Sequence, residues 1–242
     1  MSTCPARPLE VVGFACFLFA GCLGTGLPIN QKATIPDAVE DYSRDLNIIR
    51  SGAKAGPGTE ELLQRGRRAA KALLQSDGPG SMNVLERLTA GDFQKVVLKM
   101  EGFLVNREET VYVEPDPGFF LALAKRFGDR ASIDFFEAFR KTAPDAWPVY
   151  IQQQTHYSGC ARFGSLSLVE TYGRWTAFRT EHPKRYSAEV AVFLRRVEEE
   201  LTEGNCACEG KDAVLSEVVA LTAPPQPGCF VTMTPEAQRT NV

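Results

Sequence analysis

Apolar side chains recur at the spacing of an α-helix along most of the chain between residues 36 and 223. The first such stretch places a residue on one helix face every three or four positions: Val39, Tyr42, Leu46 and Ile49. Pro36 precedes them and suits a first helical position, where its missing N–H would have no partner anyway. The pattern predicts a helix that ends before the glycine-containing linker of residues 51–58.

A second helix is predicted after Thr59, a residue type whose hydroxyl caps helix N-termini. Glu60 and Glu61 would lie in its first turn, where carboxylates interact favourably with the helix dipole. Its apolar face comprises Leu62, Leu63, Ala70, Leu73 and Leu74. Its basic side chains are Arg65, Arg67, Arg68 and Lys71. We expect these basic side chains to form a solvated helix face rather than a site for an anionic partner.

Residues 119–139 hold six of the fifteen phenylalanines in the chain. Asp116-Pro117 is a helix start signal, because a capping side chain is followed by a first-turn proline. Gly128 suits the end of that helix, and a second helix would stop at Pro144. Aromatic residues at helical spacing are typical of a core, so we expect this helical hairpin to form the centre of the domain.

The remaining segments are also predicted to be mainly helical. Further helices are expected to begin near Met82, after Asp92 as an N-cap, at Ser167 with capping-box spacing to Glu170, at Ser187 and after Asp212. Only residues 111–113 have clear strand character, and residues 147–165 show no regular pattern. The predicted fold class is mainly α: a single multi-helix domain with at most a short β element, stapled by disulfides near its C-terminus.

A short uncharged apolar run, residues 11–22, lies close to the N-terminus. Arg7 precedes it, and it ends in Phe19-Ala20-Gly21-Cys22. The run is too short to span a bilayer, which needs about 20 apolar residues, but it suits the core of an export signal. The segment resembles a bacterial lipoprotein signal, in which the cysteine after the small residues becomes lipidated and forms the new N-terminus.

This resemblance implies a signal peptide at residues 1–21 and a lipid anchor at Cys22, which begins an anchor and tether at 22–35. The residue pattern predicts a helical domain at 36–223 and a proline-rich polar tail at 224–242. Lipid on Cys22 would attach the protein to a membrane without spanning it, in the cell envelope and facing the periplasm. Secretion with cleavage nearby is one alternative. A buried N-terminal helix of a cytoplasmic protein is the other.

Four cysteines would remain after export: Cys160, Cys206, Cys208 and Cys229. An even number suits a disulfide framework in an oxidising compartment. A bond between Cys206 and Cys208 is disfavoured, because a single intervening residue makes a strained ring. We therefore expect Cys160 and Cys229 each to pair with one of these two. A metal site is disfavoured as well, because Cys-x-Cys lacks the two-residue spacer typical of structural zinc.

Composition and motifs narrow the classes of function. The net charge of −3 and the pI near 5.6 give no general attraction to nucleic acid, so we expect no nucleic-acid partner. The sequence contains no phosphate-binding loop, nucleophile elbow or HExxH zinc helix. We predict no catalytic residue, no cofactor and no metal.

The polar loop around Gln153, His156 and Tyr157 is the candidate binding site in the sequence. His156 could act as the base for a Cys160 nucleophile, but a cysteine in a disulfide cannot attack a substrate. The favoured interpretation is a non-catalytic envelope lipoprotein that binds an envelope protein, the cell wall or a small ligand. One alternative is an exported hydrolase with a site around His156, and another is a cytoplasmic helical protein that binds metal.

Overall fold

The computed structural model describes residues 33–53, 56–76, 81–155, 158–203, 207–208 and 219. In chain order these residues form α1 (Asp37–Arg50), α2 (Thr59–Leu73), α3 (Val84–Arg87), α4 (Ala90–Lys99), β1 (Phe103–Asn106), β2 (Tyr112–Pro115), α5 (Pro117–Phe127), α6 (Arg130–Thr142), β3 (Ile151–Thr155), β4 (Ser158–Ala161), α7 (Ser167–Glu181) and α8 (Ser187–Glu203). The prediction of a mainly α fold is confirmed. None of the helices described is long and apolar enough to cross a membrane.

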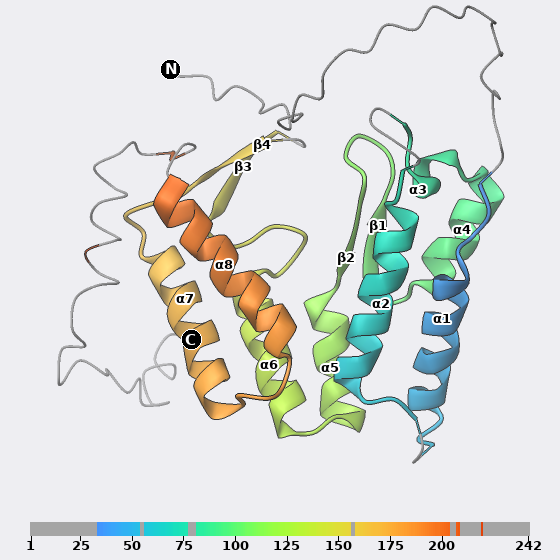
Figure 1. Cartoon of the computed structure of the whole chain (residues 1–242), viewed down its shortest axis with the longest axis horizontal. Coiled ribbons are helices and arrows are strands. Elements are labelled where there is room, and N and C mark those ends of the chain that lie inside the picture. Colours follow the sequence, from blue (N-terminus) through green and yellow to red (C-terminus); the bar gives the residue numbers. More distant parts are fainter. Residues whose placement is uncertain are drawn as a thin grey trace, which may run out of the picture.

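The helices pack largely in the order of the chain. Helix α1 packs on α2 and α4, α2 packs on α5 and on β2, and α5, α6, α7 and α8 follow one another (Figure 1). Figure 1 places α1, α2 and α4 at one end of the molecule and α6, α7 and α8 at the other. In this view the β1–β2 hairpin lies between the two groups.

The predicted helical hairpin is α5 and α6, and it does form the centre of the core. The Asp116 carboxylate accepts hydrogen bonds from the Gly118 and Phe119 amides, as expected of an N-cap before Pro117. Phe135 of α6 is fully buried and its ring contacts five other aromatic rings: those of Phe136, Phe139, Trp175, Phe178 and Tyr186. The aromatic cluster therefore joins α6 to α7 and to the segment before α8.

The prediction that Thr59 caps α2 is wrong. Gly58 is the N-cap and Thr59 is the first helical residue. The buried Thr59 hydroxyl donates to Ser132 Oγ at 2.8 Å and lies 3.1 Å from the Tyr186 hydroxyl. The Thr59 side chain therefore links α2 to α6 and to the start of α8.

Two other predicted caps lie inside their helices. Helix α4 is capped by Thr89, whose Oγ1 accepts a hydrogen bond from the Asp92 amide at 3.2 Å, so Asp92 belongs to the first turn. Helix α7 starts at Ser167 itself and follows Leu166, which has a left-handed backbone with φ of 62°. Ser167 makes no capping bond to the helix, and the predicted capping box with Glu170 is absent.

Two antiparallel hairpins, β1–β2 and β3–β4, supplement the helices. The strand character of residues 111–113 was expected and corresponds to β2. The β3–β4 hairpin, in the segment predicted to be irregular, was not expected. Its polar residues Gln152, Gln153 and Gln154 are all exposed, so the strand carries no alternating apolar pattern. Ile151 anchors it on a small second core that includes Leu168 and Val197 from α7 and α8.

A disulfide joins Cys160 on β4 to Cys208, with the Cα atoms 5.2 Å apart. The Cys208 amide also donates to the Ala161 carbonyl at 2.9 Å, so this residue continues the edge of the hairpin. The bond agrees with the expectation that Cys160 pairs with one member of the Cys-Ala-Cys sequence. Cys22, Cys206, Cys229 and the helix expected after Asp212 lie outside the described residues, apart from residue 219.

Candidate functional site

An open cleft of about 460 Å³ lies between the β1–β2 hairpin and the segment that follows α6. The hairpin supplies Tyr112 and most of the polar lining, and the opposite wall carries Trp147 together with Gln153 from β3. This volume is within the range of about 300–1,000 Å³ that is usual for small-ligand sites. The cleft is therefore large enough for a small molecule or a short chain segment.

The lining of the cleft is acidic. Among the described residues it contains no basic side chain and four carboxylates, which belong to Glu108, Glu109, Glu114 and Asp145. Asp145 also fixes the wall locally, because its Oδ1 accepts the Trp147 amide hydrogen at 2.7 Å. Carboxylates gathered in a hollow surface concentrate a negative potential there. The cleft should therefore attract cationic groups.

A smaller pocket of about 30 Å³ adjoins the cleft and shares Glu114, Asp145 and Ala146 with it. Its apolar wall is built from α6, α7 and α8. Trp175 and Phe193 stack with ring centroids 4.4 Å apart, and Phe139 packs on Phe193 at 5.1 Å. A volume near 30 Å³ has room for about two water-sized groups. Only the end of a ligand would fit.

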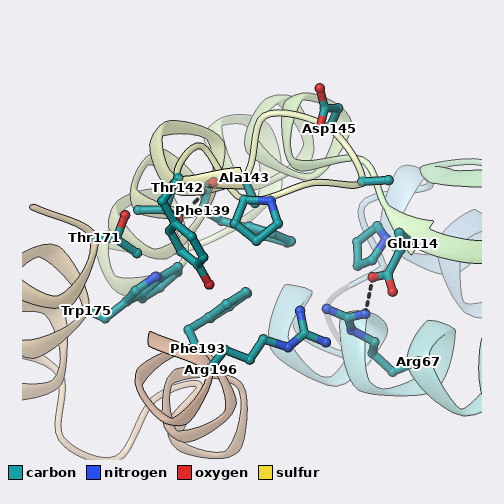
Figure 2. Close-up of a pocket in the computed structure, with 14 residues that line it drawn as sticks. Arg67, Glu114, Phe139, Thr142, Ala143, Asp145, Thr171, Trp175, Phe193 and Arg196 are labelled. Carbon is teal, nitrogen blue, oxygen red and sulfur yellow. Dashed lines mark hydrogen bonds and ion pairs between the residues drawn. The ribbon is translucent and has the colours of Figure 1, made fainter. Parts of the chain in front are cut away.

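Two arginines approach this pocket from opposite sides. Arg67 extends from α2 and Arg196 from α8, and Figure 2 shows their guanidinium groups pointing toward one another. Arg67 forms ion pairs with Glu114 at 2.6 Å and with Glu189 at 3.5 Å. Arg196 has no carboxylate partner among the described residues. The expectation that Arg67 faces solvent is therefore wrong, because tertiary packing places it between β2 and α8.

Two of the residues that line the pocket have a buried polar atom without a hydrogen-bond partner among the described residues, Trp175 Nε1 and Thr171 Oγ1. Trp175 is 0% exposed and Thr171 is 3% exposed. A buried polar atom without a hydrogen bond typically costs about 1–3 kcal/mol. Tyr150 lines the same pocket, and burial raises the pKa of its phenol to about 12. These groups are all neutral at pH 7, and both unpartnered atoms can donate a hydrogen bond.

The candidate loop from the sequence is only partly within the described residues. Gln153 lies on β3 and lines the cleft, whereas His156 and Tyr157 fall outside the described residues. Cys160 is in the disulfide, and its sulfur lies 3.2 Å from Gln154 Nε2. In this state Cys160 cannot serve as a nucleophile. Sequence reasoning did not find Arg196, Trp175 or Glu114, because no local pattern distinguishes them from ordinary surface and core residues.

A second group of potential ligand atoms lies at the end of α7. His182 Nε2 is 3.1 Å from the Asp134 carboxylate of α6 and 3.8 Å from that of Glu181. Arg130 also contacts the Asp134 oxygen that faces His182, at 2.9 Å. A guanidinium on this oxygen competes with a metal ion for it. The His182–Asp134 contact is best explained as a connection between α6 and the end of α7.

Comparison of the chain with family models, with curated proteins and with solved structures gives no match. The chemistry of the site therefore follows from its own geometry. The cleft offers negative charge and aromatic surface to a ligand. The pocket at its inner end has Arg67 and Arg196 beside Glu114 and Asp145.

Proposed function

We propose that this chain is a non-catalytic lipoprotein of the cell envelope whose helical domain binds a cationic ligand in the acidic cleft. The observation that carries the proposal is the cleft lining, whose described residues include four carboxylates and no basic side chain. Arg67 pairs with one of these carboxylates, that of Glu114, from outside the cleft. Trp147 and Tyr112 add aromatic rings to the same surface. Aromatic faces attract ammonium and guanidinium groups, so the rings and the carboxylates favour the same class of ligand.

The envelope location is supported by two features of different kinds. The first is the lipoprotein-like segment of residues 11–22, with Cys22 as the lipidated residue. The second is the Cys160–Cys208 disulfide, since such bonds persist mainly in oxidising compartments. In this proposal residues 23–35 connect the anchor to the domain, and the domain presents its cleft to the periplasm.

The anchor can be tested by mass spectrometry of the N-terminus of protein purified from its native host. The expected N-terminal residue is Cys22 carrying acyl chains. An intact N-terminus at Met1 or Ser2 would contradict the proposed location.

Binding can be tested by calorimetry with trilysine amide, a short peptide that carries only positive charges. We expect binding that weakens as salt rises, because exposed charge interactions are screened. The double variant Glu108→Gln/Asp145→Asn keeps the shape of the cleft and removes two charges, so it should weaken binding by about tenfold. The matched control is Glu170→Gln/Glu199→Gln, which removes two exposed carboxylates on α7 and α8 outside the cleft. Equal losses in both double variants would point to net charge rather than to the cleft.

A further inference from the structure

We infer that Arg67 is an internal competitor of the cationic ligand: it pairs with Glu114 of the acidic cleft, and a bound cation displaces it toward Glu189. The inference rests on the proposed function, because it concerns how binding in the same cleft is regulated. It depends on a different observation, which is that one guanidinium reaches carboxylates on two other elements. Arg67 belongs to α2, Glu114 to β2 and Glu189 to the first turn of α8.

The Glu114 carboxylate is shared between the cleft and the pocket at its inner end. Glu114 lines both of them, whereas Arg67 lines only the pocket. The ion pair between the two residues is 2.6 Å long, and 33% of the Glu114 side chain is exposed (Figure 2). A ligand in the cleft therefore meets a carboxylate whose charge the guanidinium already offsets. The attraction between Glu114 and the ligand is weakened, since opposite charges in contact cancel much of each other's field.

Glu189 gives Arg67 a second carboxylate to pair with. Arg67 Nη2 lies 3.5 Å from the Glu189 carboxylate, while Nη1 contacts Glu114. The Glu189 side chain is only 16% exposed, and a carboxylate in the first turn of a helix is stabilised by the helix dipole. Arg67 can therefore leave Glu114 by rotation of its side chain and still keep a counter-ion. The α2 backbone does not have to move.

A competing role and a purely structural role of Arg67 predict opposite effects on binding. If the Arg67–Glu114 pair served only to hold β2 on α2, its loss would loosen one wall of the cleft and weaken binding. If Arg67 competes with the ligand, its loss leaves the Glu114 carboxylate unpaired and strengthens binding. The sign of the change in affinity therefore distinguishes the two roles.

The experiment measures the affinity of the full chain for trilysine amide by calorimetry. Arg67→Met removes the cation and keeps most of the side-chain volume, and we expect it to bind about tenfold more tightly than wild type. Arg67→Lys keeps a positive charge at this position and should bind like wild type. The matched control is Arg68→Met, at an exposed position of α2 that lines neither the cleft nor the pocket. This control should change the affinity by less than about twofold, because exposed charges are screened.

Glu189→Gln tests the second carboxylate with Arg67 retained. Without Glu189 the guanidinium stays on Glu114, so binding should weaken by about threefold or more. The same substitution in the Arg67→Met background should change the affinity little, because no guanidinium is left to compete. Glu199→Gln removes an exposed carboxylate from the same helix and is the control for the loss of charge.

Three results would overturn the inference and leave the acidic cleft as a cation site. The first is a folded Arg67→Met, as judged by circular dichroism, that binds no more tightly than wild type. The second is an equal effect of Glu189→Gln in both backgrounds. The third applies even if Arg67→Met does not fold, and it is an equal affinity of Glu189→Gln and Glu199→Gln. If neither wild type nor Arg67→Met binds trilysine amide, the proposed function is overturned together with the inference.

Discussion

Arg185 Nε donates a hydrogen bond of 2.7 Å to Glu60 Oε2, although the two residues are 125 positions apart in the sequence. The other Glu60 oxygen accepts the Tyr186 amide hydrogen at 2.6 Å. One carboxylate in the first turn of α2 thus holds two successive residues of the segment before α8. Tyr186 has a left-handed backbone with φ of 52°, which is unfavourable for a bulky residue without such support.

Glu60→Gln should therefore destabilise the domain. The amide retains one acceptor oxygen but cannot accept from both the Arg185 guanidinium and the Tyr186 amide, so we expect a loss of about 1–3 kcal/mol in the free energy of unfolding. Urea unfolding followed by circular dichroism measures this. The control is Glu61→Gln, whose exposed side chain pairs with Arg65 of the same helix, and which should change stability by less than about 0.5 kcal/mol. Equal effects of the two substitutions would refute the role of Glu60.

A second prediction concerns acid stability and Asp129. Hydrogen bonding from Arg185 is the main cause that lowers the pKa of this carboxyl below its usual value of 3.8, with further contributions from the Ser132 hydroxyl and amide. A carboxyl whose pKa is lowered in the folded state stabilises the fold fully when the pH is above its unfolded-state pKa. This stabilisation is lost as the pH falls from the unfolded-state pKa through the folded-state pKa. Asp129→Asn should thus be less stable than wild type at pH 7, and the difference should shrink below about pH 4.

The measurement is urea unfolding of wild type and Asp129→Asn at pH 7, 5 and 3. Asparagine also caps helices, so the N-cap of α6 is kept and the change reports mainly on the charge. Asp37→Asn, at an exposed first-turn position of α1, serves as the control for removing a carboxylate at a helix start. A difference between wild type and Asp129→Asn that does not depend on pH would contradict the prediction.

Much of this architecture could be predicted from the sequence, because local patterns determine it. The apolar spacing of α1 and the Asp116-Pro117 start of α5 depend only on neighbouring residues, and both predictions are correct. The site was harder to find because α2, β2, α6, α7 and α8 each contribute to the pocket. Arg67 occurs among other basic residues of α2, and only the packing of α2 on β2 brings it to Glu114.

The disulfide gives a third prediction. Cys160 and Cys208 are 48 positions apart, and closing a loop of this length contributes about 4 kcal/mol in the chain-entropy model. Cys160→Ser/Cys208→Ser should therefore lower the free energy of unfolding by a few kcal/mol.

With this bond formed, Cys206 and Cys229 are the remaining pair. Thiol titration of denatured, unreduced protein from the native host should find no free thiol in the mature chain. Four free thiols would contradict both bonds.

The last prediction concerns Gly66, where we expect the opposite of the usual effect of replacing a helical glycine by alanine. It lies within α2, where replacement by alanine normally stabilises a helix by about 1 kcal/mol. Here a Cβ atom would overlap the ring of Phe103 on β1 and approach the Tyr42 ring to 3.0 Å.

Both of these rings are buried and pack edge to face with centroids 5.3 Å apart, so neither can move without disturbing the core between α1 and β1. We expect Gly66→Ala to lower the free energy of unfolding by about 1–3 kcal/mol, since overpacking outweighs the gain in propensity. Gly91→Ala in α4 is the matched control, because a Cβ there would contact nothing within 4 Å. Thermal unfolding should show a lower melting temperature for Gly66→Ala and an unchanged or higher one for Gly91→Ala. Stabilisation by both substitutions would mean that α2 does not approach β1 this closely.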